Sequence, residues 1–271
     1  MSIKQKLSDI YWLGLRTFLY NDLLEYLFFS KGYAKEINDT IILVPFKYSW
    51  FYPKTYEADK TIFIHNHSKP GDTVIDIGAH LGIFSFFLAR QVGINGKVYS
   101  FEPTQKTFNA LTQTIKYNKL NKIIDARQVA VSDTSGELEF YIYSNSSISN
   151  GNSISSHNTV GTPRKTTVGK ICLDDLMVTE KIERLTLIKI DAEGAELDIL
   201  KGGKKLITKF HPFITLEVHP KSFDDPQKIM NEIYATIIDY GYTIIMNNNT
   251  LTLEEFCLNK TFFEVLLIPN K

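Results

Sequence analysis

The chain has 271 residues, of which 44% are hydrophobic and 22% charged, and its 30 basic side chains balance its 30 acidic ones. This composition is typical of a folded protein and excludes a disordered chain, and the length favours one catalytic domain with a short appendage. Because there is no overall positive charge, nucleic acid is not an expected partner.

The two cysteines, Cys172 and Cys257, are far apart in the sequence and form neither a metal-type nor a redox-type pair. They therefore support neither a disulfide framework nor a zinc site. This usage favours a reducing, cytoplasmic setting.

Residues 10–29 are dense in aromatic and aliphatic side chains. Polar and charged residues interrupt the segment and no cleavage motif accompanies it, so we expect neither a membrane span nor a secretory signal. Its large apolar residues recur in steps of three or four, which predicts an amphipathic helix built on Trp12, Leu15, Leu19, Leu23 and Leu27. This helix either lies on the catalytic domain, makes a homodimer contact or binds peripherally to the inner face of a membrane.

We expect residues 1–50 to form N-terminal accessory helices and a lead-in strand, and residues 51–271 to form the catalytic domain. The lead-in strand or hairpin is predicted at 40–48 and a helix at 56–66. The turn Lys-Pro-Gly-Asp precedes the first core strand at 73–77, and the following helix begins at Ile83.

From there on, strand-like and helix-like segments alternate, which is typical of an α/β domain. The strands are short apolar runs, as expected when both faces of a sheet are covered. The predicted strands are 97–101, 125–131, 185–190 and 212–218, and the predicted helices are 104–117, 193–200 and 229–240. Residues 242–246 and 262–268 are expected to form a closing antiparallel hairpin. The sequence thus predicts a mostly parallel, doubly wound sheet with a C-terminal antiparallel hairpin and an N-terminal helical appendage.

A further pair of strands is expected outside this alternation. Residues 136–143 alternate like a half-exposed strand, and residues 166–171 can pair with them. The stretch 144–161 between them is rich in Ser and Asn. It is either a substrate-facing lid or a flexible excursion.

The segment Val-Ile-Asp-Ile-Gly-Ala-His-Leu-Gly at 74–82 places Gly78 and Gly82 where a strand turns into a helix. Glycine permits close backbone approach, and the free N–H groups of a helix start favour an anionic group. Asp76 adds a carboxylate that can bind the ammonium group of a sulfonium-bearing amino acid. A dinucleotide fingerprint requires glycine where this chain has His80, so pyrophosphate binding is disfavoured.

Glu102 ends the next strand in Tyr-Ser-Phe-Glu-Pro, 24 residues after Gly78. An acidic side chain at this place can accept hydrogen bonds from both hydroxyls of a ribose, although nicotinamide-binding folds use the same device. The structural alternative is a surface glutamate and two helix-packing glycines. The joint spacing of Asp76, the glycines and Glu102 favours adenosine binding.

Ile-Lys-Ile-Asp-Ala-Glu-Gly-Ala-Glu-Leu at 188–197 is again a strand that runs into a helix. Asp191 either caps that helix or, as we expect, belongs to a ligand site at the carboxyl ends of adjacent strands. Glu193 and Glu196 are either functional or placed there by the positive N-terminal end of the helix.

Glu217 and His219 lie two residues apart at the end of a strand and therefore share one face next to the site. Histidine titrates near neutral pH, so His219 is the expected catalytic base for a hydroxyl proton, with Asp191 and Glu217 beside it. A divalent metal held by Asp191, Glu217 and His219 is the rival way to acidify the hydroxyl, although we do not expect one.

These motifs, with Ala-Val-Ser-Asp-Thr-Ser-Gly at 130–136 and Leu-Asp-Asp-Leu at 173–176, resemble those of the FkbM family of methyltransferases and follow its order over roughly residues 56–219. The resemblance implies a Rossmann-like class I methyltransferase fold, S-adenosylmethionine as the cofactor, and methylation of a hydroxyl on a sugar, glycan or polyketide. It also implies that Asp191 lies close to the reacting groups. The cofactor residues that it implies are Asp76, Gly78, Ala79, His80, Gly82, Glu102, Pro103 and Ala130, with Ser132 and Asp133 near the adenine.

The sequence therefore predicts an O-methyltransferase in which an oxygen of a sugar, glycan or glycolipid attacks the methyl group of S-adenosylmethionine in line with the sulfonium. The protein would mainly supply alignment and exclude water. The acceptor is alternatively a polyketide hydroxyl or a uronic carboxylate. Two other classes stay open, namely a non-catalytic binding protein with the cofactor fold and a reductase linked to NAD.

Overall fold

The computed structural model describes residues 30–142 and 164–270. The amphipathic segment 10–29 and the Ser/Asn-rich stretch 144–161 lie outside the described residues, so their expected roles stay predictions. Within the described part of the chain, no helix is long and apolar enough to cross a membrane.

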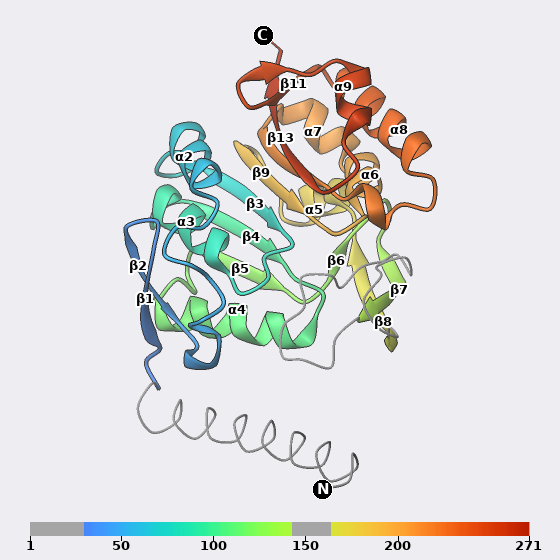
Figure 1. The fold of residues 1–271 in the computed structure, drawn as a ribbon. Coiled ribbons are helices and arrows are strands. Elements are labelled where there is room, and N and C mark those ends of the chain that lie inside the picture. The colour runs from blue at the N-terminus through green and yellow to red at the C-terminus, as the bar shows by residue number, and fades with distance from the viewer. Residues whose placement is uncertain (1–29, 143–163, 271) are drawn as a thin grey trace, which may run out of the picture.

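In the described residues the central sheet has eight strands in the order β12-β11-β13-β10-β9-β3-β4-β5 (Figure 1). Five neighbouring strands are parallel, and β13 and β11 add an antiparallel edge beside β10. This arrangement confirms the mostly parallel sheet with a C-terminal antiparallel pair. The strands are β3 (Thr73–Ile77), β4 (Lys97–Phe101), β5 (Ile124–Arg127), β9 (Leu187–Asp191), β10 (Phe213–Val218), β11 (Tyr242–Met246), β12 (Asn249–Thr250) and β13 (Phe263–Pro269).

Helices cover both faces of this sheet because alternate strand residues point to opposite sides. Val74 and its register partners Val98 and Leu187 belong to one buried cluster, whereas the adjacent Ile75 and Ile188 belong to the other. The first cluster includes residues of α2 (Ala58–His67), α3 (Ile83–Val92) and α4 (Gln105–Tyr117). The second includes residues of α5 (Leu173–Thr179), α6 (Glu196–Gly202), α7 (Lys204–Phe210), α8 (Pro226–Asp239) and α9 (Leu253–Leu258). Short 3-10 helices lie at η1 (Phe46–Tyr48) and η2 (Pro220–Ser222).

The predicted strand over 125–131 is two strands in two different sheets. The last pair between β4 and β5 joins Phe101 and Arg127, so the chain has no partner on β4 beyond that point. It instead forms β6 (Ala130–Val131), which pairs with β8 (Arg164–Ile171) in a sheet of order β6-β8-β7 within the described residues. The antiparallel pairing of β8 with β7 (Gly136–Ile142) is as predicted.

Two other elements differ in detail from the sequence prediction. The lead-in segment is a hairpin of β1 (Tyr33–Ile37) and β2 (Thr40–Val44), turned at Asn38 and Asp39, which both have positive φ. The closing pair β11 and β13 is not joined by a simple turn, because β12 and α9 lie between the two strands. A capping box of Thr252 and Glu255 starts α9.

The chain order of the strands reverses between β3 and β9, where ligands bind in sheets of this kind. Gly78 lies at this point with φ of +73°, and its N–H donates to the carbonyl of Phe101. A Cβ atom added to Gly78 would lie 1.7 Å from the carbonyl oxygen of Asp191. The loops after β3 and β9 therefore pack so closely that only glycine fits.

Gly78→Ala is expected to destabilise the protein by on the order of 3 kcal/mol, since a positive φ and a backbone overlap are both penalised. Gly71→Ala is the matched control, because Gly71 also has positive φ but an added Cβ would meet its nearest atom at 3.9 Å. The control is expected to lose only about 1 kcal/mol. Urea unfolding measures both losses, and equal losses would contradict the packing argument.

Candidate active site

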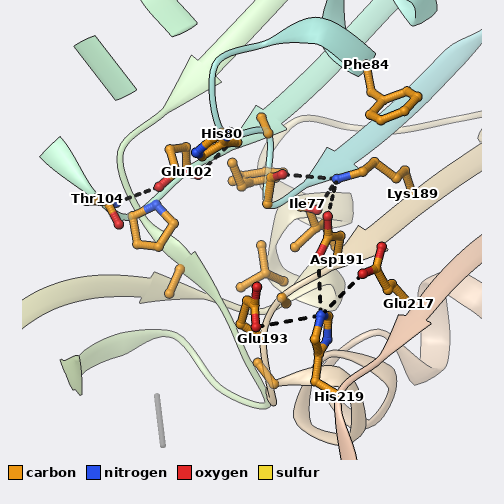
Figure 2. A pocket seen from close by; sticks show the side chains of 18 of the residues that line it. Ile77, His80, Phe84, Glu102, Thr104, Lys189, Asp191, Glu193, Glu217 and His219 are labelled. Carbon is orange, nitrogen blue, oxygen red and sulfur yellow. Dashed lines mark hydrogen bonds and ion pairs between the residues drawn. The ribbon is translucent and has the colours of Figure 1, made fainter. Parts of the chain in front are cut away.

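A cavity of about 540 Å³ lies at the carboxyl ends of β3, β4, β9 and β10. At one end it is lined by Glu102, and at the other by Asp191, Glu217 and His219 (Figure 2). The predicted catalytic residues and the predicted ribose-binding residue therefore share one cavity.

Glu102 is nearly buried and is fixed by three hydrogen bonds. Its Oε1 accepts from the Thr104 N–H at 2.9 Å and from the Thr107 hydroxyl at 2.7 Å, and its Oε2 accepts from the His80 N–H at 3.0 Å. Burial raises the pKa of Glu102, although these hydrogen bonds oppose the shift. A carboxylate can accept about four hydrogen bonds, so Oε2 keeps capacity for a hydroxyl donor.

Beside Glu102 the cavity wall is mostly apolar. An apolar wall next to a hydrogen-bond acceptor suits a nucleoside, whose base can pack on the wall while its ribose donates to the carboxylate. These residues therefore fit the adenosine part of S-adenosylmethionine. The apolar side chains of this wall are Ile77, Phe101, Val129, Val131 and Phe140.

Most of the predicted cofactor residues line the cavity, and four do not. Those that line it are Gly78, Ala79, His80, Glu102, Pro103, Ala130 and Asp191. The structure places Asp76, Gly82, Ser132 and Asp133 outside the lining. Asp76 is fully buried, accepts a hydrogen bond from Ser85 and lies 3.4 Å from the ammonium of Lys189. Its carboxylate therefore meets a lysine of this chain, where we predicted the ammonium group of the cofactor.

The other three residues outside the lining have structural contacts. Gly82 begins α3 with φ of +87°, and an added Cβ would lie 2.6 Å from the Leu111 side chain. Gly82 therefore has the structural role of a helix-packing glycine, which is the alternative to cofactor binding given in the sequence analysis. The Ser132 N–H donates to the Ile171 carbonyl, and Asp133 pairs with Lys170 at 3.1 Å.

At the end of the cavity opposite Glu102, three carboxylates surround one ring nitrogen of His219. The Nε2 atom lies 3.4 Å from Glu217 Oε1, 3.6 Å from Glu193 Oε2 and 3.9 Å from Asp191 Oδ1 (Figure 2). The Nδ1 atom lies 2.7 Å from Oε1 of the buried Glu196. Asp191 and Glu217 are register partners on β9 and β10, which explains why they meet.

The turn before α6 brings Glu193 into this group. We predicted a helix from residue 193, but α6 begins at Glu196, and its N-cap is Ala195. Asp191 therefore does not cap this helix. Glu193 instead lies in the turn with φ of +48° and lines the cavity. From the sequence, Glu193 was either functional or only favoured by the helix end, and the turn places its carboxylate in the site.

Two buried lysines, which we did not predict, lie behind these carboxylates. Lys189 is 3.5 Å from Asp191 Oδ2 and donates to the Gly78 carbonyl at 3.0 Å. Lys60 on α2 is 3.5 Å from Glu217 Oε2. Both lysines are only 2% exposed. Asp191 and Glu217 thus each have one oxygen near a buried ammonium and the other facing His219.

The two histidines of the cavity differ in charge. Burial opposes protonation of His219, but hydrogen bonds with Glu196 and Glu217 and the nearby negative charges outweigh it and raise the pKa of His219 to about 11. Burial lowers the pKa of His80 to about 4. At neutral pH, His219 is therefore protonated and His80 neutral. This protonation argues against our prediction that His219 accepts the hydroxyl proton.

The predicted alternative of a metal ion has a geometric basis. Asp191, Glu217 and His219 each offer one ligand atom, and these atoms all lie within 4.8 Å of one another. The ammonium groups of Lys60 and Lys189 lie beside the two carboxylates, and their positive charge opposes a second cation there. We therefore assign no metal to this group.

Comparison with known proteins shows to which class of protein this chain belongs. A family model described as the methyltransferase FkbM domain matches residues 76–244, which is more than half of the chain. Together with the fold and the cavity, this match defines an S-adenosylmethionine-dependent methyltransferase. The chain belongs to the FkbM methyltransferase family.

Curated relatives are similar over about two thirds of the chain. The hexuronic acid methyltransferase AglP of Haloferax volcanii is 24% identical and is matched over 65% of this chain and 68% of its own length. The 31-O-demethyl-FK506 methyltransferase FkbM of Streptomyces tacrolimicus is also 24% identical, over 68% of this chain and 77% of its own length. A solved FkbM methyltransferase structure from Methylobacillus flagellatus KT has a TM-score of 0.47 at 15% identity, covering 78% of this chain and 51% of that chain.

The ionisation of Glu193 predicts how the stability of the protein depends on pH. Burial raises its pKa to about 7; His219 opposes the shift, while Asp191 and other carboxylates add to it. A carboxyl whose pKa is raised on folding contributes stability that is complete below its unfolded pKa, near 4.5, and is lost as pH rises through 7. Glu193→Gln is therefore expected to be more stable than wild type by on the order of 2 kcal/mol at pH 8.5, with little difference at pH 5.

Urea unfolding at the two pH values measures this effect. The exposed Glu183→Gln is the matched control and is expected to match wild type at both pH values. A Glu193→Gln variant with the same stability difference at both pH values would show that Glu193 does not titrate near neutral pH.

Proposed function

We propose that this methyltransferase transfers a methyl group in line to a hydroxyl of a sugar, glycan or glycolipid. The observation that carries the proposal is the cluster of Asp191, Glu193 and Glu217 at the opposite end of the cavity from Glu102. Carboxylates accept hydrogen bonds, so they suit an acceptor that offers hydroxyl donors. The Glu102 end would hold the cofactor, and the carboxylate end, called the acceptor end below, would hold the acceptor.

S-adenosylmethionine, when bound, supplies an already activated methyl group, and the side chains of the site orient the acceptor and take its proton. The pKa of Asp191 is below its usual range, because Lys189, Lys60 and His219 outweigh the effect of burial, so Asp191 is a weak base. Of the three predicted catalytic residues, His219 is protonated and Asp191 is a weak base, so we assign proton acceptance to the third, Glu217, whose Oε1 lies 3.4 Å from His219 Nε2. Protonated His219 orients both carboxylates through its charge and excludes water from one side of the site.

A sugar acceptor is supported by an aromatic ring beside the carboxylates. Phe262 lines the cavity, is 69% exposed and is stacked against His219 with 6.4 Å between the ring centres. An exposed aromatic face next to hydrogen-bond acceptors suits a ring that has one apolar face and several hydroxyl groups. The concentration of carboxylates disfavours a uronic carboxylate as the acceptor, since like charges repel. A polyketide hydroxyl remains the second candidate, because the relative from Streptomyces tacrolimicus is named for a 31-O-demethyl-FK506 substrate.

The proposal is tested with purified protein, cofactor labelled in the methyl group, and fractionated glycans and glycolipids from the source cells. We expect label in a glycan or glycolipid fraction that survives mild alkali, because a methyl ether resists alkali and a methyl ester does not. Label released as methanol would identify a carboxylate acceptor instead. Label confined to other fractions would favour the polyketide alternative.

Glu217→Gln is expected to lower methyl transfer by roughly 100-fold or more while cofactor affinity changes less than about threefold. The control Glu183→Gln is expected to retain full transfer. EDTA should have no effect on the wild type. Loss of transfer in EDTA with recovery on adding Mg²⁺ or Mn²⁺ would instead support the metal alternative.

Glu102→Ala is expected to weaken S-adenosylmethionine binding by roughly 10- to 100-fold, since it removes a charged hydrogen-bond acceptor. Calorimetry with S-adenosylmethionine and with NAD measures the effect, and the exposed Glu254→Gln serves as the control. Tighter binding of NAD than of S-adenosylmethionine would contradict the cofactor assignment.

A further inference from the structure

We propose that Lys60 is a positioning residue for methyl transfer, which fixes the Glu217 carboxylate at the acceptor end of the cavity. The inference rests on the proposed function, in which Glu217 takes the acceptor proton. Lys60 does not itself line the cavity and acts through Glu217.

The side chain of Lys60 is almost completely buried, which is unusual for a lysine. It lies in the first turn of α2, and its side chain is 1% exposed. Its ammonium lies 5.0 Å from the centre of the Phe84 ring, which packs beside it. A buried charge is tolerated only when it is paired and packed, so the position of this ammonium is fixed.

Three carboxylates from three elements surround this ammonium. Glu57 precedes α2 and bonds to Lys60, Glu217 on β10 lies at 3.5 Å, and Glu264 on β13 lies at 3.3 Å. These carboxylates raise the pKa of Lys60 although burial opposes the shift, so the lysine stays charged. Lys60 therefore joins the helix before the first core strand to two neighbouring strands of the sheet.

The geometry at Glu217 shows what this contact does. Its Oε2 faces Lys60 at 3.5 Å, and its Oε1 faces His219 Nε2 at 3.4 Å. Positive groups thus hold both oxygens of the carboxylate, which fixes the direction in which it meets an acceptor. Without Lys60, Glu217 would lose one of these contacts, and the nearby Glu57 and Glu264 would repel it.

The test compares Lys60→Met with Lys60→Arg and with Lys54→Met. Lys54 is the matched control, because it is an exposed lysine close by in the sequence that pairs with Glu36 at the surface. The probes are labelled S-adenosylmethionine and the glycan or glycolipid fraction that the wild type labels.

We expect Lys60→Met to lower kcat by roughly 100-fold, the effect of a misplacement of about 1 Å, with cofactor Kd within threefold of wild type. Lys60→Arg keeps the charge and is expected to recover at least a tenth of the wild-type kcat. Lys54→Met should behave as wild type. A Lys60→Met variant within threefold of the wild-type kcat, or a Lys60→Arg variant no faster than Lys60→Met, would overturn the inference.

A double variant separates positioning from folding. In Lys60→Met, the carboxylates of Glu57, Glu217 and Glu264 repel one another without the lysine between them. Adding Glu264→Gln removes one of these charges, so the double variant is expected to regain thermal stability without regaining kcat. Recovery of kcat together with stability would show that Lys60 only balances charge. If the wild type binds the cofactor but labels no fraction, the proposed function fails, whereas normal wild-type labelling with an unaffected Lys60→Met variant overturns this inference alone.

Discussion

The active site depends on positive charge placed behind its carboxylates. Asp191, Glu193 and Glu217 converge on one ring nitrogen, and like charges at such distances repel strongly where water is scarce. Lys189 and Lys60 offset this repulsion at one oxygen each of Asp191 and Glu217, and protonated His219 offsets it at the other oxygen of each. The carboxylates can therefore gather at one end of the cavity.

The same charges join the site to the fold. Lys189 lies on β9, yet it donates to the carbonyl groups of Ile77 and Gly78 on the neighbouring strand and its loop. It also lies 3.4 Å from Asp76, the buried carboxylate of the first glycine motif. Lys189 thus contacts both the end of β3, where the strand order reverses, and the carboxylate of Asp191. A substitution that disturbs the packing of β3 against β9 will therefore also disturb the site. Gly78 of this motif also packs directly against the backbone of Asp191.

Much of this arrangement could be predicted because local pattern determines it. Short apolar strands predicted the sheet, and the carboxyl ends of parallel strands predicted that Asp191, Glu217 and His219 would meet. The role of Lys60 could not be predicted, because its partners on β10 and β13 are more than 150 residues away in the chain. The charge of His219 could not be predicted either, since it results from four carboxylates that only the fold assembles. At His80, burial outweighs the effect of Asp191, and the ring stays neutral.

The cavity is lined both by the segment that matches the FkbM family and by the segments on either side of it. The residues that fit the adenosine lie inside the segment 76–244 that matches the FkbM family. Tyr52, Tyr56, Glu57 and Phe262 line the cavity from the flanking segments, and an ion pair between Lys60 and Glu264 joins those segments to each other. If acceptor choice depends on these flanks, relatives with the same cofactor-binding segment can accept chemically different acceptors, and the acceptor of this chain must be sought from its flanking residues.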